Sequence, residues 1–185
     1  MTTHHTSHRV ALVTIGGLLA ALSLGGVAQA VTDTIFRYTT AKIGYFGIDA
    51  MALAPQNSHA ASQLSSNWDA VAGASVSADG CYNSGVHLPQ GATITQLAVW
   101  LTGGTGGSYN VALYRHKNAD GTPDRIVFQN LHGNGTRRQF NIAIPNDTIA
   151  LVSNTGYTYG FGVCMDNTAI FHSARVAYTY THAGD

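Results

Sequence analysis

The sequence predicts an all-β fold, a two-sheet antiparallel β-sandwich of jelly-roll type with about eight strands. Three observations predict it. Glu is absent and Lys occurs only twice in the 185 residues, although solvated helix faces are usually built from these two residue types. The 21 Gly residues suit tight turns between strands. After Ile35 the apolar residues come in short bursts separated by Gly, Asn, Asp and Pro, and no long stretch keeps a helical period.

The first 30 residues have the pattern of a cleaved export signal. Residues 10–24 form one apolar run that is too short to span a bilayer comfortably, and Arg9 precedes it. The run is followed by Ala28-Gln29-Ala30, the small-x-small pattern that a signal peptidase accepts. We therefore expect cleavage after Ala30, a secreted mature protein that begins at Val31, and no membrane association once the signal is removed. An uncleaved anchor is the alternative, but it would need about 20 apolar residues.

The mature chain is predicted to be a single domain. Residues 31–80 form its irregular part, with possible strands at 35–38 and 43–48 and then a loop with one helical turn near residues 60–64. Residues 81–185 carry the main sandwich strands, because Gly, Asn, Asp and Pro divide them clearly. The expected strands are 91–101, 109–115, 125–131, 137–144, 148–152, 156–165 and 169–181.

Two of these strands are predicted to pair as a hairpin across the Gly-rich stretch 102–108. One face of the pair is apolar. The other face combines two aromatic rings with amide side chains and small residues, namely Trp100, Tyr114, Gln96, Asn110, Ala98 and Ala112. Such a surface is suited to a sugar ring or a protein partner, and the two rings are expected to lie about 13 Å apart. The alternative is that residues 31–80 cover this face, which would make Trp100 an ordinary core residue.

The strand at 156–165 alternates aromatic and small residues. Tyr157, Tyr159, Phe161, Val163 and Met165 share one face, which we interpret as core, and Thr158, Gly160, Gly162 and Cys164 share the other.

Two cysteines, Cys81 and Cys164, remain after removal of the signal. An even number of cysteines in an exported chain predicts a disulfide between them. Two buried free thiols are the alternative, because the sequence does not fix the distance between the two residues.

The C-terminal hundred residues contain three motifs: a Leu-Pro-x-Gly-Ala-x-Ile/Val strand start at residues 88–94, a Leu-Tyr-Arg strand at 113–115 and a closing Ala-Arg-Ile/Val-x-Tyr strand at 174–178. In these motifs the chain resembles a group of small exported bacterial proteins. The resemblance spans roughly residues 81–182, with a weaker echo at 48–55. It implies export and a β-sandwich, and it says nothing about activity.

The sequence contains no motif that supports catalysis. It lacks the hydrolase nucleophile elbow, a phosphate-binding loop and a Cys-x-x-Cys pair, and it has no Glu with which to build a carboxylate pair. Five aspartates sit beside Gly, Asn or Pro, where a turn is the simpler interpretation: Asp79, Asp120, Asp124, Asp147 and Asp166.

Metal binding has only weak support in the sequence. The mature-chain histidines lack zinc-ligand spacing: His59, His87, His116, His132, His172 and His182. A weak calcium candidate is the loop that contains Asn118, Asp120 and Asp124, and an ordinary turn is the alternative. We expect neither a metal nor a cofactor.

Charge completes the functional prediction. Nine Asp balance nine Lys and Arg, without a basic stripe, which argues against a nucleic-acid partner. We therefore expect a secreted, non-catalytic β-sandwich that acts as an extracellular binding or surface-associated structural module, with a glycan or a protein as partner. The alternatives are a carbohydrate-binding module that uses the Trp/Tyr face, and a secreted hydrolase.

Overall fold

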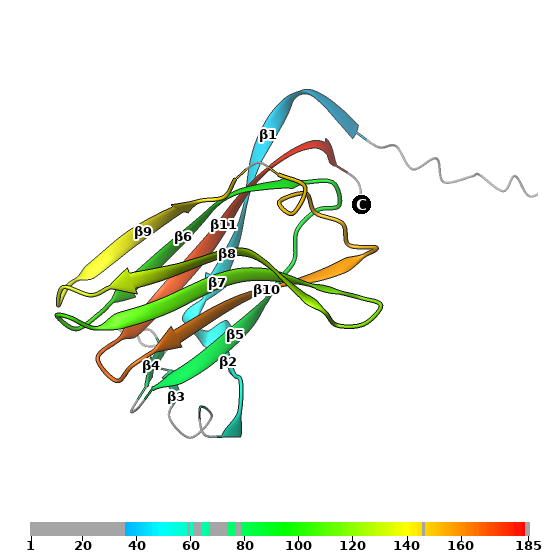
Figure 1. The fold of residues 1–185 in the computed structure, drawn as a ribbon. Coiled ribbons are helices and arrows are strands. Elements are labelled where there is room, and N and C mark those ends of the chain that lie inside the picture. The colour runs from blue at the N-terminus through cyan, green and yellow to red at the C-terminus, as the bar shows by residue number, and fades with distance from the viewer. Residues whose placement is uncertain are drawn as a thin grey trace, which may run out of the picture. The chain divides into compact units, whose positions relative to one another are not determined.

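Eleven strands and one short 3-10 helix follow one another in the computed structural model (Figure 1), which describes residues 36–58, 60, 64–66, 74–76, 79–145 and 147–183. The export signal expected at residues 1–30 lies outside the described residues. Most of the helical turn expected near residues 60–64 does so as well. No helix among the described residues has the length and apolar character needed to cross a bilayer.

The strands form two antiparallel sheets, which Figure 1 shows as two layers. Sheet A has the order β1-β11-β6-β9. The short strand β4 also pairs with β11, and the short strand β3 pairs with β4. Its strands are β1 (Phe36–Asp49), β3 (Leu64–Ser66), β4 (Ala74–Val76), β6 (Thr93–Thr102), β9 (Arg137–Ala143) and β11 (Ile170–Ala183).

Sheet B has the order β2-β5-β10-β7-β8. Its strands are β2 (Ala54–Pro55), β5 (Gly80–Val86), β7 (Ser108–Lys117), β8 (Pro123–His132) and β10 (Tyr157–Met165). The 3-10 helix η1 (Ala50–Ala52) connects β1 to β2, and the Asp49 side chain caps it by accepting a hydrogen bond from the backbone N of Met51.

The long strands pair in a nested pattern. Of the eight long strands, the first pairs with the last (β1 with β11), the second with the seventh (β5 with β10), the third with the sixth (β6 with β9) and the fourth with the fifth (β7 with β8). A long hairpin rolled into two sheets has this connectivity, which defines a jelly roll. The predicted fold class is therefore confirmed.

The core lies between the sheets and is built from alternate residues of each long strand. On β10 the inward residues are Tyr159, Phe161, Val163 and Met165, all of them buried, and half-buried Tyr157 extends this row. Phe161 of sheet B meets Phe171 of sheet A with ring centroids 5.6 Å apart. The aromatic row at 157–165 therefore belongs to the core, as its alternation predicted.

The predicted hairpin is wrong. β6 pairs with β11 and β9 in sheet A, whereas β7 pairs with β10 and β8 in sheet B. The Gly-rich stretch after Thr102 crosses from one sheet to the other, and the Tyr109 ring packs against Gly103 and Gly107 in that crossing. The apolar faces of both strands do point to the core. Alternation shows that a face is buried but does not show which sheet the strand joins.

The prediction of a strand at residues 148–152 is also wrong. Asp147 accepts hydrogen bonds from the backbone N of Ile149 and of Ala150, which closes a turn, and only Leu151 makes an isolated bridge, to Thr93. Conversely, the sequence does not predict β5 or the short strands β2, β3 and β4. The two strands predicted at 35–38 and 43–48 form the single strand β1.

Candidate binding groove

The outer face of sheet B carries a hollow of about 500 Å³ over β10, β7 and β8. Four strands meet there in register, so outward side chains form rows across the sheet. The central row contains Asn83, Gly162, Ala112 and Phe128, and the next row contains Gly85, Gly160, Tyr114 and Arg125. The floor is low because its central positions have no side chain or only a methyl group, while larger side chains stand at both sides.

Tyr114 forms one wall of the hollow and lies over the glycines of β10. A Cβ atom built on Gly160 would lie 2.5 Å from a Tyr114 ring carbon, and one on Gly162 would lie 3.4 Å from the ring. The ring is therefore seated directly on the backbone of β10, and this burial raises the pKa of Tyr114 above its ordinary value. His116 extends the wall, with its ring centroid 5.0 Å from that of Tyr114.

The disulfide forms another part of the floor. Cys81 and Cys164 face each other across β5 and β10 with a Cα–Cα distance of 4.0 Å, and the bond between them confirms the predicted pairing over the alternative of two free thiols. Because Cys164 alternates with the core residues of β10, the bond lies on the outer surface of the sandwich and not in its core.

The hollow continues past the disulfide into a second one of about 470 Å³. The two share Gln56, Asn110 and Cys164, so together they form one groove, which we call the sheet B groove. The amide groups along it are ordered by contacts such as that of Gln56 Nε2, which donates to Asn83 Oδ1 at 3.0 Å. Asp79 and Asp166 line the second hollow.

A β-bulge brings two further side chains to the groove. Ala112 pairs with Phe128, yet Tyr114 pairs with Arg125, so β8 has one extra residue where the register shifts. In a regular strand residues 125 and 128 would point to opposite faces, and the bulge lets both point outward. The Arg125 guanidinium carbon then lies 4.7 Å from the centroid of the Phe128 ring.

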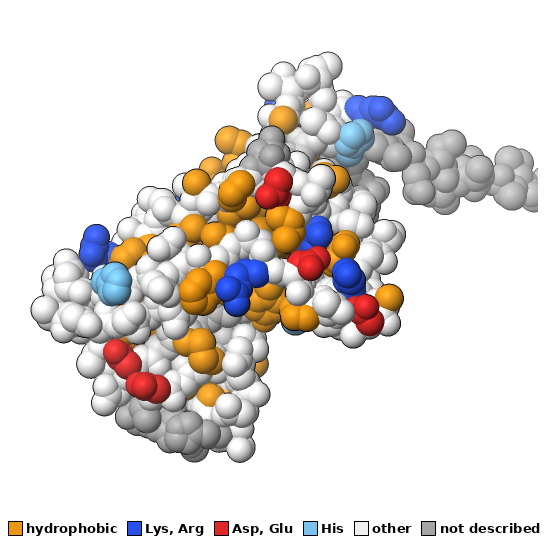
Figure 2. Space-filling model, viewed as in Figure 1, with side chains coloured by type: hydrophobic (Ala, Val, Ile, Leu, Met, Phe, Trp, Pro, Cys, Tyr) orange, Lys and Arg blue, Asp and Glu red, His pale blue; other side chains and the backbone are white. Residues whose placement is uncertain are grey.

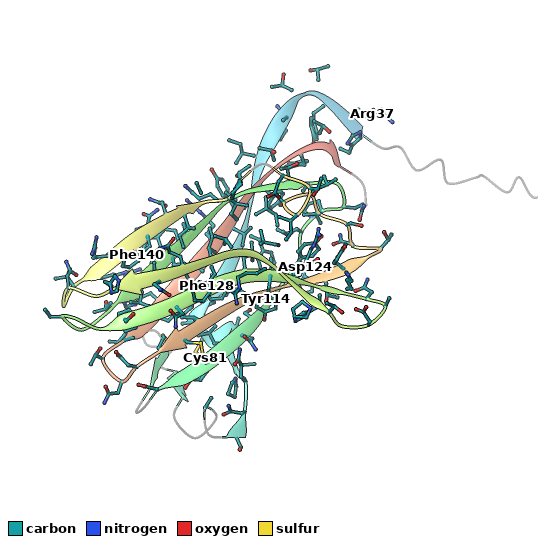
Figure 3. All side chains as sticks on the ribbon, in the orientation of Figure 1. Arg37, Cys81, Tyr114, Asp124, Phe128 and Phe140 are labelled. Carbon is teal, nitrogen blue, oxygen red and sulfur yellow. A yellow bond between two sulfur atoms is a disulfide. The ribbon has the colours of Figure 1, made fainter. Side chains whose placement is uncertain are left out.

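Figures 2 and 3 show this face. In Figure 2 a basic side chain lies in the middle of the face between hydrophobic side chains, and acidic side chains lie at the lower left as well as at the upper centre and the right. Figure 3 places Phe128 and Tyr114 beside each other on β8 and β7, with Cys81 farther along toward β5.

The structure separates the four residues that the sequence grouped as a binding face. Tyr114 and Asn110 line the sheet B groove, whereas Trp100 and Gln96 lie on the outer face of sheet A. The spacing expected between Trp100 and Tyr114 is therefore wrong, because it assumed that β6 and β7 pair. Whether any of the four residues binds a ligand stays a prediction.

Trp100 is neither core nor freely exposed. β1 lies in the same sheet as β6, on the far side of β11, and Trp100 is half-buried. Its ring centroid lies 5.4 Å from the guanidinium carbon of Arg175, which also lies 4.6 Å from the Tyr45 centroid. The alternative that made Trp100 an ordinary core residue is thus wrong.

The side chains of the calcium candidate have partners within the protein. Asp120 accepts from the backbone N of Thr122, the Asn118 amide donates to the carbonyls of Asn154 and Thr155, and Asp124 pairs with Arg115 Nε at 3.2 Å. Each side chain thus has a partner of its own, and in the part of the chain that the structure describes no three His, Cys, Asp or Glu residues gather as metal ligands do.

Comparison with known proteins gives distant structural similarity only. No protein-family model and no curated protein matches the chain. Among solved structures, the C-terminal CBM6 of LamC, a laminarinase from Zobellia galactanivorans, has 12% identity and a TM-score of 0.46, with 72% of this chain and 98% of that chain covered. The CBM36-1 domain of a xylanase from the hindgut metagenome of Trinervitermes trinervoides has 9% identity and a TM-score of 0.47, with 72% and 96% covered.

A third solved structure is the carbohydrate-binding module CBM6cm-2 of Cellvibrio mixtus lichenase 5A in complex with cellotriose. It has 11% identity and a TM-score of 0.44, with 71% of this chain and 95% of that chain covered. At these values no residue or ligand of the three proteins is transferred to this chain.

Proposed function

We propose that this protein is an exported, non-catalytic binding module whose ligand is a glycan held in the sheet B groove. The observation that carries the proposal is the groove itself, which has a low floor of glycine, alanine and disulfide between walls that carry amides and aromatic rings. The disulfide supports the extracellular part of the proposal, because such bonds persist in oxidising compartments.

The chemistry of the walls matches a sugar chain. A sugar ring has an apolar face and a rim of hydroxyl groups. The ring of Phe128 is 42% exposed and offers a flat apolar contact, while the amides of Gln56, Asn83 and Asn110 offer both donors and acceptors. The groove follows β10 from the level of Tyr114 past the disulfide, a length of about 20 Å at 3.3 Å per residue, which is room for several sugar units.

The hydrolase alternative has one observation in its favour. Asp79 and Asp166 line the same hollow, and glycoside hydrolysis uses two carboxyl groups. Asp166, however, accepts hydrogen bonds from the backbone N and the hydroxyl of Thr168 through one oxygen, the arrangement of a turn residue. We therefore propose binding without hydrolysis.

The test uses two matched variants. The purified protein is titrated calorimetrically with soluble neutral and acidic polysaccharides, and release of reducing sugar is measured in parallel. Phe128→Ala removes an exposed ring with an arginine 4.7 Å away, and Tyr45→Ala removes an exposed ring with an arginine 4.6 Å away on the other sheet. We expect Phe128→Ala to weaken binding about tenfold, or 1.4 kcal/mol, and Tyr45→Ala to leave it unchanged.

Each other result contradicts part of the proposal. Loss of binding in Tyr45→Ala alone moves the site to the outer face of sheet A, where Trp100 lies. Release of reducing sugar establishes a hydrolase. No binding to any polysaccharide overturns the glycan as ligand.

A further inference from the structure

The sheet B groove is electrically polarised along its length. In the hollow at the Phe128 end, Arg125 is the permanently charged side chain, and the described residues that line it include no carboxylate. In the hollow at the far end, beyond the disulfide, the charged side chains are Asp79 and Asp166. A ligand in the groove therefore meets a cation at one end and two carboxylates at the other.

Arg125 has no carboxylate partner among the residues that the structure describes. Its neighbour in sequence, Asp124, pairs instead with Arg115, which also stacks 4.0 Å from the Tyr157 centroid, on the side of β7 away from the groove. Among the described residues no carboxylate oxygen lies within 4.0 Å of the Arg125 guanidinium. The nearby acid, Asp124, is thus paired with Arg115. The bulge in β8 turns Arg125, but not Asp124, toward the groove.

Arg125 is also held in place. Its guanidinium lies over the Phe128 ring, and the Tyr114 ring is opposite it on β7. A stacked guanidinium has lost part of its freedom before a ligand arrives, and its planar fork of N–H donors fits a carboxylate with two parallel hydrogen bonds.

We propose that the groove is selective for an acidic glycan, in which the carboxylate of a uronic acid pairs with Arg125 beside Phe128 and neutral sugar units extend over the disulfide. This inference rests on the proposed function and adds the ligand class and its direction. The direction follows from the charges, because a carboxylate placed at the far end would face Asp79 and Asp166. The preferred ligand is accordingly acidic at one end and not along its whole length.

The test compares ligands that differ only at the carboxyl group. The probes are oligosaccharides that end in one uronic acid, built on glucose, xylose and galactose backbones, each paired with its carboxyl-reduced counterpart. We expect the wild-type protein to bind at least one acidic probe about tenfold more tightly than its reduced form, and to lose that preference at high salt.

Two arginine variants locate the preference. Arg125→Gln removes the charge in the groove, and Arg138→Gln is the matched control, since Arg138 also stacks on a phenylalanine, with 5.1 Å from its guanidinium carbon to the Phe140 centroid, but lines a different hollow. We expect Arg125→Gln to weaken binding of the acidic probe about tenfold while binding of the reduced probe changes less than twofold. Arg138→Gln should change neither.

The outcomes separate this inference from the proposed function. Equal affinity for both members of every pair, with binding still lost in Phe128→Ala, overturns the acidic preference and leaves a glycan-binding groove. Equal weakening by Arg125→Gln and Arg138→Gln reduces the preference to general charge attraction and also overturns it. Failure of all glycans to bind overturns the proposed function and this inference with it.

Discussion

The outer faces of the two sheets use similar residues and produce different surfaces. Each face has an arginine stacked on an aromatic ring, Arg175 on Tyr45 in sheet A and Arg125 on Phe128 in sheet B. In sheet A, however, Arg175 lies between Trp100 and Tyr45 and beside Ala98, which is fully buried despite pointing outward. In sheet B the Tyr114 ring rests on Gly160 and Gly162, but Ala112 beside them is only half-buried, and the surface stays hollow there.

This difference shows what makes a groove on a flat sheet. Small residues are necessary but not sufficient, because a long neighbouring side chain that lies across them fills the space they leave. Arg175 does so in sheet A, and its Nε is buried without a hydrogen-bond partner. Arg125 stands at the wall of the groove instead, because it lies on the edge strand β8 and the bulge turns its side chain outward.

The largest expected effect concerns the disulfide, which only sheet B has among the described residues. Replacing both Cys81 and Cys164 by Ala removes a link that closes a separation of 83 residues, and the free energy of unfolding should fall by about 4 kcal/mol on the chain-entropy model. Urea denaturation of the double variant measures this. An unchanged midpoint would contradict a structural role for the bond.

Substitution of one glycine on the outer face of each sheet tests how closely other side chains pack against that face. Gly160→Ala drives a methyl group into the Tyr114 ring, and we expect a loss of about 1 to 3 kcal/mol together with weaker glycan binding. Gly47→Ala on the outer face of sheet A meets no atom within 4 Å and should change stability by about 0.5 kcal/mol or less. Urea midpoints that shift equally would show that the ring does not rest on Gly160.

The stability cost of replacing Trp100 tests whether the outer face of sheet A differs from the core. Because Trp100 is half-buried and stacked beside Arg175, Trp100→Ala should cost about 1 to 2 kcal/mol, less than the 3 to 5 of a core aromatic. Trp100→Phe keeps a ring at this position and should recover part of the loss. Glycan binding, measured in the same preparations, should be unaffected, and its loss would return the binding site to sheet A.

The smallest effect is a pH dependence in sheet A. Burial, and secondarily the charge of Arg137, lowers the pKa of His172 below its ordinary value of 6.5, and its Nε2 lies 2.8 Å from the Thr102 hydroxyl. The folded state therefore favours the neutral ring, so stability should fall as the pH drops through about 6.5 and the unfolded chain takes up the proton. The difference in unfolding free energy between pH 8 and pH 5 should be smaller in His172→Gln, and an equal difference would contradict the shift.

Much of the sandwich was predictable from the sequence, and most of the groove was not. Strict alternation at residues 97–101 and 157–165 identified inward faces, since burial on one side of a strand forces a period of two. The cysteine count predicted the disulfide. Alternation does not identify a strand's partners. The sequence therefore suggests that β6 pairs with β7, although the two strands belong to different sheets.

The groove depends on long-range register, which explains why the sequence did not locate it. Tyr114 and Asn110 were identified as candidates, but Phe128, Arg125, Asn83 and Gln56 were not. The residue that the bulge adds to β8 leaves no signature in its sequence, and Asn83 reaches the groove only because β5 pairs with β10. One signal was available, namely that Gly160, Gly162 and Cys164 share a face, which marks a row of small residues on which an aromatic ring from the next strand can rest.

The nested pairing of the strands also orders the closure of the chain during folding. β7 and β8 are adjacent in sequence and close the shortest loop, and β6 with β9, β5 with β10 and β1 with β11 each close a longer one around it. Because the entropy lost in closing a loop grows with its length, each inner pair shortens the search for the next, and we expect assembly from the β7–β8 hairpin outward. The disulfide bridges the third pair. Its oxidation should therefore follow the two inner pairs and lock them in place, while the pairing of β1 with β11 lies outside the loop that the bond closes.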